Sequence, residues 1–294
     1  MPDFSTLSRR QKTLAVNISN RGSKGPLHLL SARVSKSRAK ASGTRASMVA
    51  PNGARRTTAD HPAVPVTIPD IVETAVACHA AGAGAIHFHV RDADQQHILD
   101  AGLYREALAA LRHAVPEMHL QITTEAVGRY SPDQMRQLAL DVMPPGISIA
   151  TSEMIPDRQP SYDDVVLYRT LHEAGTSIQH ILYHPKDVNL LADLLTAAEL
   201  PNTAIWCLFV IGHYTGRISD PGMITTFVAA AAARGLDPDW AICAFAAEEN
   251  DSLVTAVAQG GKLRVGFENS LFMPDGSIAA DNASRVAAAN RLFG

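Results

Sequence analysis

The sequence has few cysteines, few aromatic residues and no long apolar run, and each shortage argues against a class of protein. Its three cysteines, Cys78, Cys207 and Cys243, are odd in number and far apart. We therefore expect free buried thiols in a reducing, cytoplasmic compartment and no disulfide framework. No stretch approaches the roughly 18 consecutive apolar residues of a membrane span, so no membrane partner is expected. A hydrophobic share of 46% against 19% charged residues is instead typical of an α/β protein with a sizeable core.

Charge is distributed unevenly along the chain. Residues 1–46 carry ten Lys or Arg and one acid, whereas the remainder carries 16 basic and 28 acidic residues. The basic segment shows no sustained helical or strand period, so we expect a disordered extension at 1–46 and one catalytic domain at 47–294. A transit peptide, a nucleic-acid-binding arm, a dispensable extension and a start site placed too early all fit the segment. The last two are favoured, and no nucleic-acid partner is predicted from a basic arm alone.

Beyond this segment, short apolar runs alternate with amphipathic stretches of about 10 to 15 residues, which is typical of repeated βα units and a parallel sheet. Several of the expected helices have a proline or a capping side chain in the first turn. The expected strands are 47–51, 85–90, 119–124, 146–150, 177–183, 203–210, 240–244 and 262–266. The expected helices begin near Pro69, Gly102, Pro132, Tyr162, Lys186, Pro221, Glu249 and Asp281.

Eight such units predict an α/β fold of one domain, a closed (β/α)8 TIM barrel. The rival architecture is an open doubly wound sheet, which ordinarily carries a Gly-rich phosphate loop after its first strand. No GxGxxG or Walker-type loop is present, and the Gly-Ala-Gly-Ala run at 82–85 ends a helix and enters a strand. In barrels the chemistry lies where strands end and βα loops begin, so those positions hold the candidate site residues.

A His-x-His pair ends the second expected strand. Because side chains alternate along a strand, His87 and His89 point to one side and Phe88 to the other. A lone strand histidine is usually structural, but a pair at this position favours a metal. Glu268 follows the eighth strand at the same end, and two histidines with one carboxylate suit zinc and leave a position open for a carbonyl or water. Arg264 would bind a substrate carboxylate or form a salt bridge inside the barrel.

Several separated segments agree in order and spacing with one known family. They are 52–55, 65–67, 87–92, 123–125, 208–210 and 260–269. From about residue 48 to residue 294 the sequence resembles the β-keto acid cleavage enzyme family. The resemblance implies a Claisen-type acyltransferase with one Zn²⁺ per chain, in which a small β-keto acid and acetyl-CoA give acetoacetate and a new acyl-CoA. It further implies a homodimer or homotetramer.

The resemblance also assigns residues. It implies His87, His89 and Glu268 as the zinc ligands and Arg264 as a residue that binds or activates the substrate. Other positions that it marks are Asn52 and Arg55 for substrate binding, and Thr124, Ser148 and Asn269 in the catalytic set, with Thr124 and Ser148 near substrate oxygens.

Two positions depart from the family's pattern. Asn269 stands where an acid usually follows the metal-binding glutamate, and an amide cannot accept a proton as a carboxylate does, which leaves the general base open. Arg55 stands where some members have an acid that meets an amine. A cation at that position favours an anionic or neutral keto acid over a cationic one.

Two other functions compete with this interpretation. A metal-dependent hydrolase of the amidohydrolase type also uses His-x-His in a barrel, and His180 and His184 near the fifth strand fit it. That plan, however, has its pair on the first strand and usually adds a lysine and a closing aspartate. A catalytically quiet metal and acyl-CoA binding protein fits the loss of an acid at Asn269. We interpret the remaining histidines as surface or packing residues: His61, His97, His113, His172 and His213. Of these, His213 lies in the loop after the sixth strand, at the face where barrels hold their active sites.

Overall fold

The computed structural model describes residues 47–212, 219–245 and 249–293, which lie in one compact unit, Ala41–Gly294. The predicted basic extension at 1–46 lies outside the described residues, so its disorder and the domain boundary stay predictions. His213 also lies outside them.

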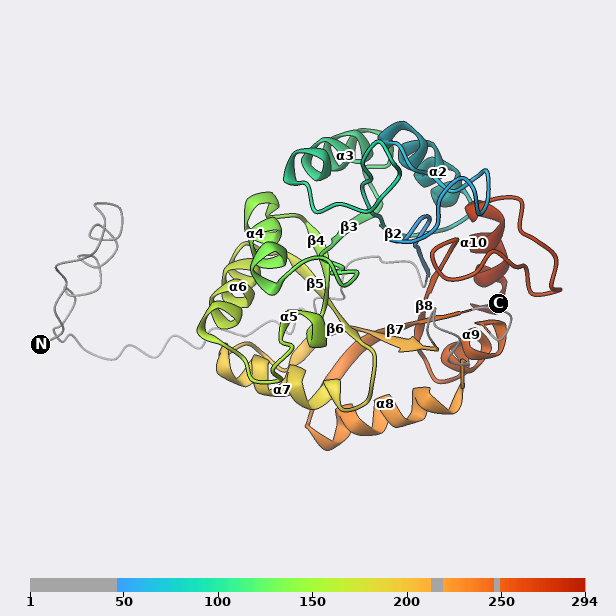
Figure 1. Cartoon of the computed structure of the whole chain (residues 1–294). Coiled ribbons are helices and arrows are strands. Elements are labelled where there is room, and N and C mark those ends of the chain that lie inside the picture. Colours follow the sequence, from blue (N-terminus) through green and yellow to red (C-terminus); the bar gives the residue numbers. More distant parts are fainter. Residues whose placement is uncertain (1–46, 213–218, 246–248, 294) are drawn as a thin grey trace, which may run out of the picture. The chain divides into compact units, whose positions relative to one another are not determined.

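Eight parallel strands form a closed barrel in sequence order, as predicted (Figure 1). The first strand pairs with both the second and the eighth, which closes the sheet. Compared with the prediction, the second strand ends three residues earlier and the seventh begins three residues earlier. The strands are β1 Ser47–Val49, β2 Ala85–His87, β3 His119–Thr123, β4 Gly146–Ala150, β5 Ser177–Leu182, β6 Thr203–Ile211, β7 Asp237–Ala244 and β8 Lys262–Val265.

Helices cover the outside of the barrel, and the eight predicted ones begin within one residue of their expected starts. Thr67, Ser131 and Ser161 begin three of them with capping boxes, in which the N-cap side chain and the third helical side chain satisfy each other's backbone N–H groups. A four-residue helix, α5, was not predicted because it is too short to show a period. The helices are α2 Ile68–Ala80, α3 Ala101–Ala114, α4 Pro132–Val142, α5 Thr151–Met154, α6 Tyr162–Glu173, α7 Asp187–Ala197, α8 Gly222–Ala233, α9 Glu249–Ala258, α10 Asn282–Asn290 and the 3₁₀ helix η1 Arg291–Phe293.

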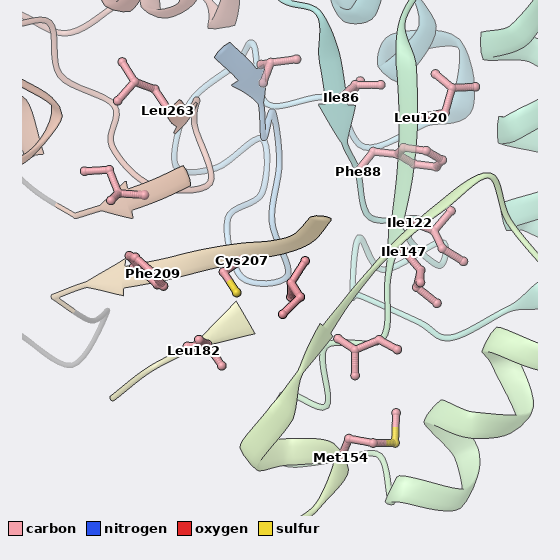
Figure 2. Packing of buried hydrophobic residues seen from close by; sticks show 14 of the residues in the cluster. Ile86, Phe88, Leu120, Ile122, Ile147, Met154, Leu182, Cys207, Phe209 and Leu263 are labelled. Atoms are coloured by element: carbon pink, nitrogen blue, oxygen red, sulfur yellow. The ribbon is translucent and has the colours of Figure 1, made fainter. Parts of the chain in front are cut away.

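Strand side chains alternate between an outer layer and the barrel interior. Ile86 and Phe88 belong to the main buried cluster (Figure 2), so His87 and His89 face inward, as the alternation predicted. The interior has an apolar side, where Val210 of β6 lies in a second buried cluster with residues of β4, β5 and β7. At the carboxyl end of the barrel, β2, β3 and β8 contribute the polar inward-facing residues His87, Thr123 and Arg264. The predicted ligands therefore lie on the polar side of the barrel interior.

The three cysteines are buried and free, in agreement with the prediction of unpaired thiols. Among the residues described, no helix combines the length and hydropathy that crossing a membrane requires.

The β1–β8 seam continues beyond the strands into the loops at the carboxyl end of the barrel. The Glu268 N–H donates to the Ala50 carbonyl over 3.0 Å. The Asn282 side chain accepts from the Phe267 N–H at 2.8 Å and donates to the Pro51 carbonyl at 3.1 Å. These bonds hold the loop after β8 against the loop after β1.

Gly266 marks the tightest point of this seam. Its φ is 140°, and a Cβ at this position would lie 2.4 Å from the Ala50 carbonyl oxygen, which belongs to the backbone and cannot turn away. We expect Gly266→Ala to lower the free energy of unfolding by roughly 3 kcal/mol, from backbone strain and the clash together. Urea denaturation measures this loss.

Gly276→Ala is the matched control, because Gly276 also has a positive φ, 84°, but apart from its chain neighbours no atom of the described residues lies within 4 Å of its added Cβ. Strain alone is expected to cost about 1–2 kcal/mol there. Equal losses in the two variants would contradict the close approach at Gly266.

His180 introduces a pH dependence into the packing outside the barrel. Its ring stacks on Tyr168 with centroids 5.6 Å apart, and burial lowers its pKa from 6.5 to about 4. The folded chain resists protonation of this imidazole more than the unfolded chain does. The stabilisation is therefore present above pH 6.5 and is lost as the pH falls towards 4.

From pH 7 to pH 4 the free energy of unfolding falls in the wild type partly because His180 becomes protonated. We expect this fall to be smaller in His180→Phe, by up to about 3 kcal/mol. Urea denaturation at the two pH values measures the difference. An identical loss of unfolding free energy in both proteins would show that folding does not lower the pKa of His180.

Candidate metal centre

Three potential ligands converge at the carboxyl end of the barrel. His87 is the last residue of β2, His89 follows in the next loop, and Glu268 lies three residues beyond β8. Their Nε2 and carboxylate oxygen atoms all lie within 4.8 Å of one another, and all three side chains are buried. The Nε2 atoms lie 3.1 Å apart, and Glu268 Oε2 is 3.5 Å from His87 Nε2 and 3.7 Å from His89 Nε2. The structure thus brings together the three predicted metal ligands.

The donor set fits a divalent cation. Burial is the largest cause that lowers the pKa of both histidines well below 6.5, so both imidazoles are neutral at pH 7. Glu268 Oε2 is buried and has no hydrogen-bond partner in the described part of the chain. A buried carboxylate oxygen without a partner is costly, and a shared cation would satisfy it together with the two imidazoles.

Asn52, predicted to bind substrate, is committed to the backbone around His89. Its Nδ2 donates to the carbonyls of His89 and Pro65 at 2.9 and 3.0 Å, and its Oδ1 accepts from the His89 N–H at 3.2 Å. These bonds lie two residues beyond the end of β2. Asn52 therefore holds the backbone of His89, one of the three potential metal ligands.

Arg264 lies beside the ligand set. Its Nη2 donates to Glu268 Oε1 at 2.7 Å, and the same nitrogen lies 3.8 Å from the Cys243 sulfur. The salt bridge inside the barrel is therefore present. The side chain also lines the cavity over the ligands, and its contact with a substrate carboxylate stays a prediction.

The cavity over the ligands has a polar and an apolar side. The Thr123 hydroxyl side chain and the Glu125 and Glu153 carboxylates contribute to the polar side. The cavity is lined by His87, Thr123, Glu125, Ala150, Glu153, Ile181, Tyr183, Val210, Cys243, Phe245, Arg264 and Glu268.

Three of the predicted catalytic residues do not line this cavity: Thr124, Ser148 and Asn269. The Thr124 hydroxyl donates to the Ser148 carbonyl at 3.3 Å, so it ties β3 to β4. Ser148 itself is buried one inward-facing position before Ala150, deeper in the barrel. Strand alternation explains the shift, because Gln121 and Thr123 share the inward face of β3 and Thr124 does not.

Like Asn269, the predicted substrate-binding residue Arg55 does not line the cavity over the ligands. Asn269 is 1% exposed, lies outside the cavity lining, and its side-chain amide has no hydrogen-bond partner within the described residues. Arg55 is exposed, and its charge lowers the pKa of Glu125 and Glu153. Arg55, the cation predicted to favour an anionic or neutral keto acid, thus acts electrostatically on two carboxylates.

Several residues around the site were not singled out from the sequence. Glu125 Oε2 lies 3.7 Å from His89 Nε2, and burial, with the charges of Glu268 and Glu153, raises the pKa of Glu125 to about 8. The inward alternation of Gln121, Thr123 and Glu125 is the signal that would have found it.

Two polar side chains contact the far nitrogens of the ligand histidines. His87 Nδ1 lies 2.8 Å from Gln121 Oε1, and His89 Nδ1 lies 3.3 Å from His97 Nδ1. His97 had been interpreted as a surface or packing residue, but it is 2% exposed and contacts a ligand. Such contacts orient metal ligands in many proteins.

The fifth-strand histidines do not join the ligands. His180 faces away from the barrel interior and stacks on Tyr168, and His184 is exposed. The His87, His89 and Glu268 group is the metal-ligand cluster that the described residues offer. Within the parts of the chain that the structure describes, the further strand-end ligands expected of an amidohydrolase do not join this group.

Comparison with known families decides the assignment. The beta-keto acid cleavage enzyme family matches residues 48–294. The chain belongs to the β-keto acid cleavage enzyme family. The match covers the whole barrel, including all three clustered ligands.

Individual members of this enzyme family are distant in sequence. The 3-oxoadipate:acetyl-CoA acetyltransferase of Cupriavidus necator is 25% identical over 234 residues, which cover 78% of this chain and 81% of that protein. The 3-keto-5-aminohexanoate cleavage enzyme of Fusobacterium nucleatum is 23% identical over 244 residues, which cover 82% of this chain and 88% of that protein.

Solved structures are similar in fold. The complexes of ObcA with oxaloacetate, and with a C4-CoA adduct and oxalate, each align with a TM-score of 0.64 at 15% identity. The alignment covers 78% of this chain and 63% of the ObcA chain. At this identity the likeness supports the barrel fold alone.

Metal removal tests the cluster directly. We expect the wild type to hold about one divalent ion per chain, and Glu268→Gln and His89→Ala to weaken zinc binding about 100-fold or more, since each removes one of three ligands. Metal analysis after dialysis and competition with a chromophoric chelator measure this.

His113→Ala is the control, because His113 is an exposed histidine of α3. It should bind zinc as the wild type does. Full zinc occupancy in both ligand variants would rule out this centre.

Proposed function

We propose that this protein is a zinc-dependent β-keto acid cleavage enzyme that exchanges acyl groups between a small β-keto acid and acetyl-CoA. The acetyl group moves from sulfur to the two-carbon carboxylate fragment of the keto acid, giving acetoacetate. The remaining acyl group moves to CoA, giving a new acyl-CoA, so atoms balance without an oxidant or reductant. Family membership and the names of the Cupriavidus and Fusobacterium relatives support this reaction.

The observation that carries the proposal is the buried His87, His89 and Glu268 group, of which His87 and Glu268 line a cavity at the carboxyl end of the barrel. Zinc bound there supplies Lewis-acid stabilisation for negative charge that develops on a keto oxygen. Two neutral imidazoles and one carboxylate are the donor types that zinc takes in catalytic sites.

Around the ligands, the chain's own side chains receive specific tasks. Arg264 holds Glu268 through its 2.7 Å bond and adds positive charge to the cavity that accepts the keto-acid carboxylate. Thr123, which lines the cavity, stands closer to substrate oxygens than the Thr124 and Ser148 predicted from the sequence. Because the Asn269 amide cannot take up a proton, Glu125 is a carboxylate placed to do so.

The apolar side of the cavity indicates which acyl chain the keto acid carries. Ile181, Val210 and Phe245 offer no charged partner for the acyl chain. Arg55, expected to favour an anionic or neutral chain, lies close enough to Glu125 and Glu153 for its charge to be offset. We therefore favour a short uncharged acyl chain. Assembly as a homodimer or homotetramer and a cytoplasmic location stay predictions.

Incubation of the zinc-loaded protein with acetyl-CoA and a panel of neutral, anionic and cationic β-keto acids tests the reaction. We expect acetoacetate to form only when acetyl-CoA is present, most rapidly with neutral chains. Arg264→Met should lower kcat/KM about 100-fold or more. Arg234→Met, which alters an exposed arginine paired with Asp193, is the control and should act as the wild type does.

Other results would assign a different function. Cleavage without CoA would indicate a hydrolase. Zinc and acetyl-CoA binding without any product after long incubation would indicate a binding protein. A cationic keto acid as the best substrate would contradict the preference for an uncharged chain.

A further inference from the structure

His97 is held from several sides in the loop after β2. Its backbone pairs with Arg91 in an isolated antiparallel bridge. Its carbonyl accepts from Arg129 Nη1 and from the Tyr130 hydroxyl, both at 3.4 Å. The imidazole is 2% exposed, and its centroid lies 4.7 Å from that of His89. The ring therefore has a defined place beside a metal ligand.

The two nitrogens of His97 have different partners, and one partner fixes the proton. Nε2 lies 3.1 Å from the backbone carbonyl of Glu125, which can only accept a hydrogen bond, so Nε2 carries the proton. A neutral imidazole then has a bare Nδ1. A 180° flip of the His97 imidazole would lose both the contact with the Glu125 carbonyl and the contact with His89.

The bare Nδ1 of His97 faces His89 Nδ1 at 3.3 Å. His89 meets this acceptor when its own Nδ1 carries the proton and donates it. The Nε2 of His89 is then unprotonated, and this is the atom that lies 3.1 Å from His87 Nε2 and 3.7 Å from Glu268 Oε2. In the metal-free protein His87 then carries its own proton on Nε2 and donates it to His89. A carbonyl on the loop after β3 thereby determines which nitrogen of His89 is available to a metal.

We infer that His97 is a positioning residue that holds His89 in the tautomer with Nε2 free for the metal. The inference rests on the proposed metal site for its purpose, but the tautomer itself is a property of the metal-free protein. Gln121 provides no equivalent control of His87. A side-chain amide offers both a donor and an acceptor and can meet either tautomer.

Three variants separate this role from simple packing. His97→Phe keeps a ring of similar shape and removes both nitrogens. His97→Asn loses shape but keeps an acceptor near the position of Nδ1. His180→Phe is the matched control, because it makes the same change at another buried histidine, on the outer side of β5.

The tautomer of His89 is read from nitrogen chemical shifts in long-range ¹H–¹⁵N spectra of the metal-free protein, and zinc affinity is read by chelator competition. We expect His89 in the wild type to carry its proton on Nδ1. Zinc affinity should fall about 10- to 100-fold in His97→Phe and less in His97→Asn, and should stay unchanged in His180→Phe.

A packing role predicts the opposite order, with His97→Phe tolerated and His97→Asn the weaker binder. That order, or a proton on His89 Nε2 in the metal-free wild type, would overturn the inference. If the wild type binds no zinc at all, the proposed function fails, and the nitrogen shifts still decide whether His97 controls the tautomer.

Discussion

The burial of the Glu268 carboxylate is the constraint on which the site depends. Removing a carboxylate from water costs several kcal/mol, and this burial raises the pKa of Glu268. Arg264 offsets part of that cost by pairing with one oxygen. The second oxygen faces two neutral imidazoles, which supply no charge. A cation between them would complete the compensation, so the same burial that strains the metal-free site favours metal binding.

The loop after β1 supports ligands that come from two other strands. Asn52 holds the backbone of His89, while a Cβ on the adjacent Gly53 would lie 2.5 Å from Glu268 Cγ. Arg91 donates to backbone carbonyls of the same loop, which fixes its course. One segment therefore sets the separation between ligands from β2 and β8. Only a residue without a side chain permits the close approach to Glu268.

Much of the architecture could be predicted from the sequence, because the barrel repeats one local pattern eight times. The convergence of His87 and His89 follows from the two-residue period of a strand, and Glu268 from the rule that strand ends share one face. The resemblance supplied the family, which the family match confirmed.

The finer assignments depend on which face of a strand turns inward and on contacts between segments that are distant in the sequence. Thr123 lines the cavity in place of Thr124, because the inward face of β3 is set by its register with neighbouring strands. The Asn52 side chain bonds to the backbone of His89, and His97, eight residues further along the chain, contacts the His89 ring. Contacts of this kind are decided by tertiary packing, so a sequence pattern of helices and strands does not show them.

The order in which the ligands occur along the chain has a consequence for biosynthesis. During translation His87 and His89 emerge long before Glu268, which completes the set only when β8 docks beside β1. A nascent chain thus offers two imidazoles without the carboxylate that balances a divalent charge. We therefore expect tight binding of an ion only in the finished barrel. Once bound, the ion links the ends of the second and eighth strands, which flank β1 where the cylinder closes.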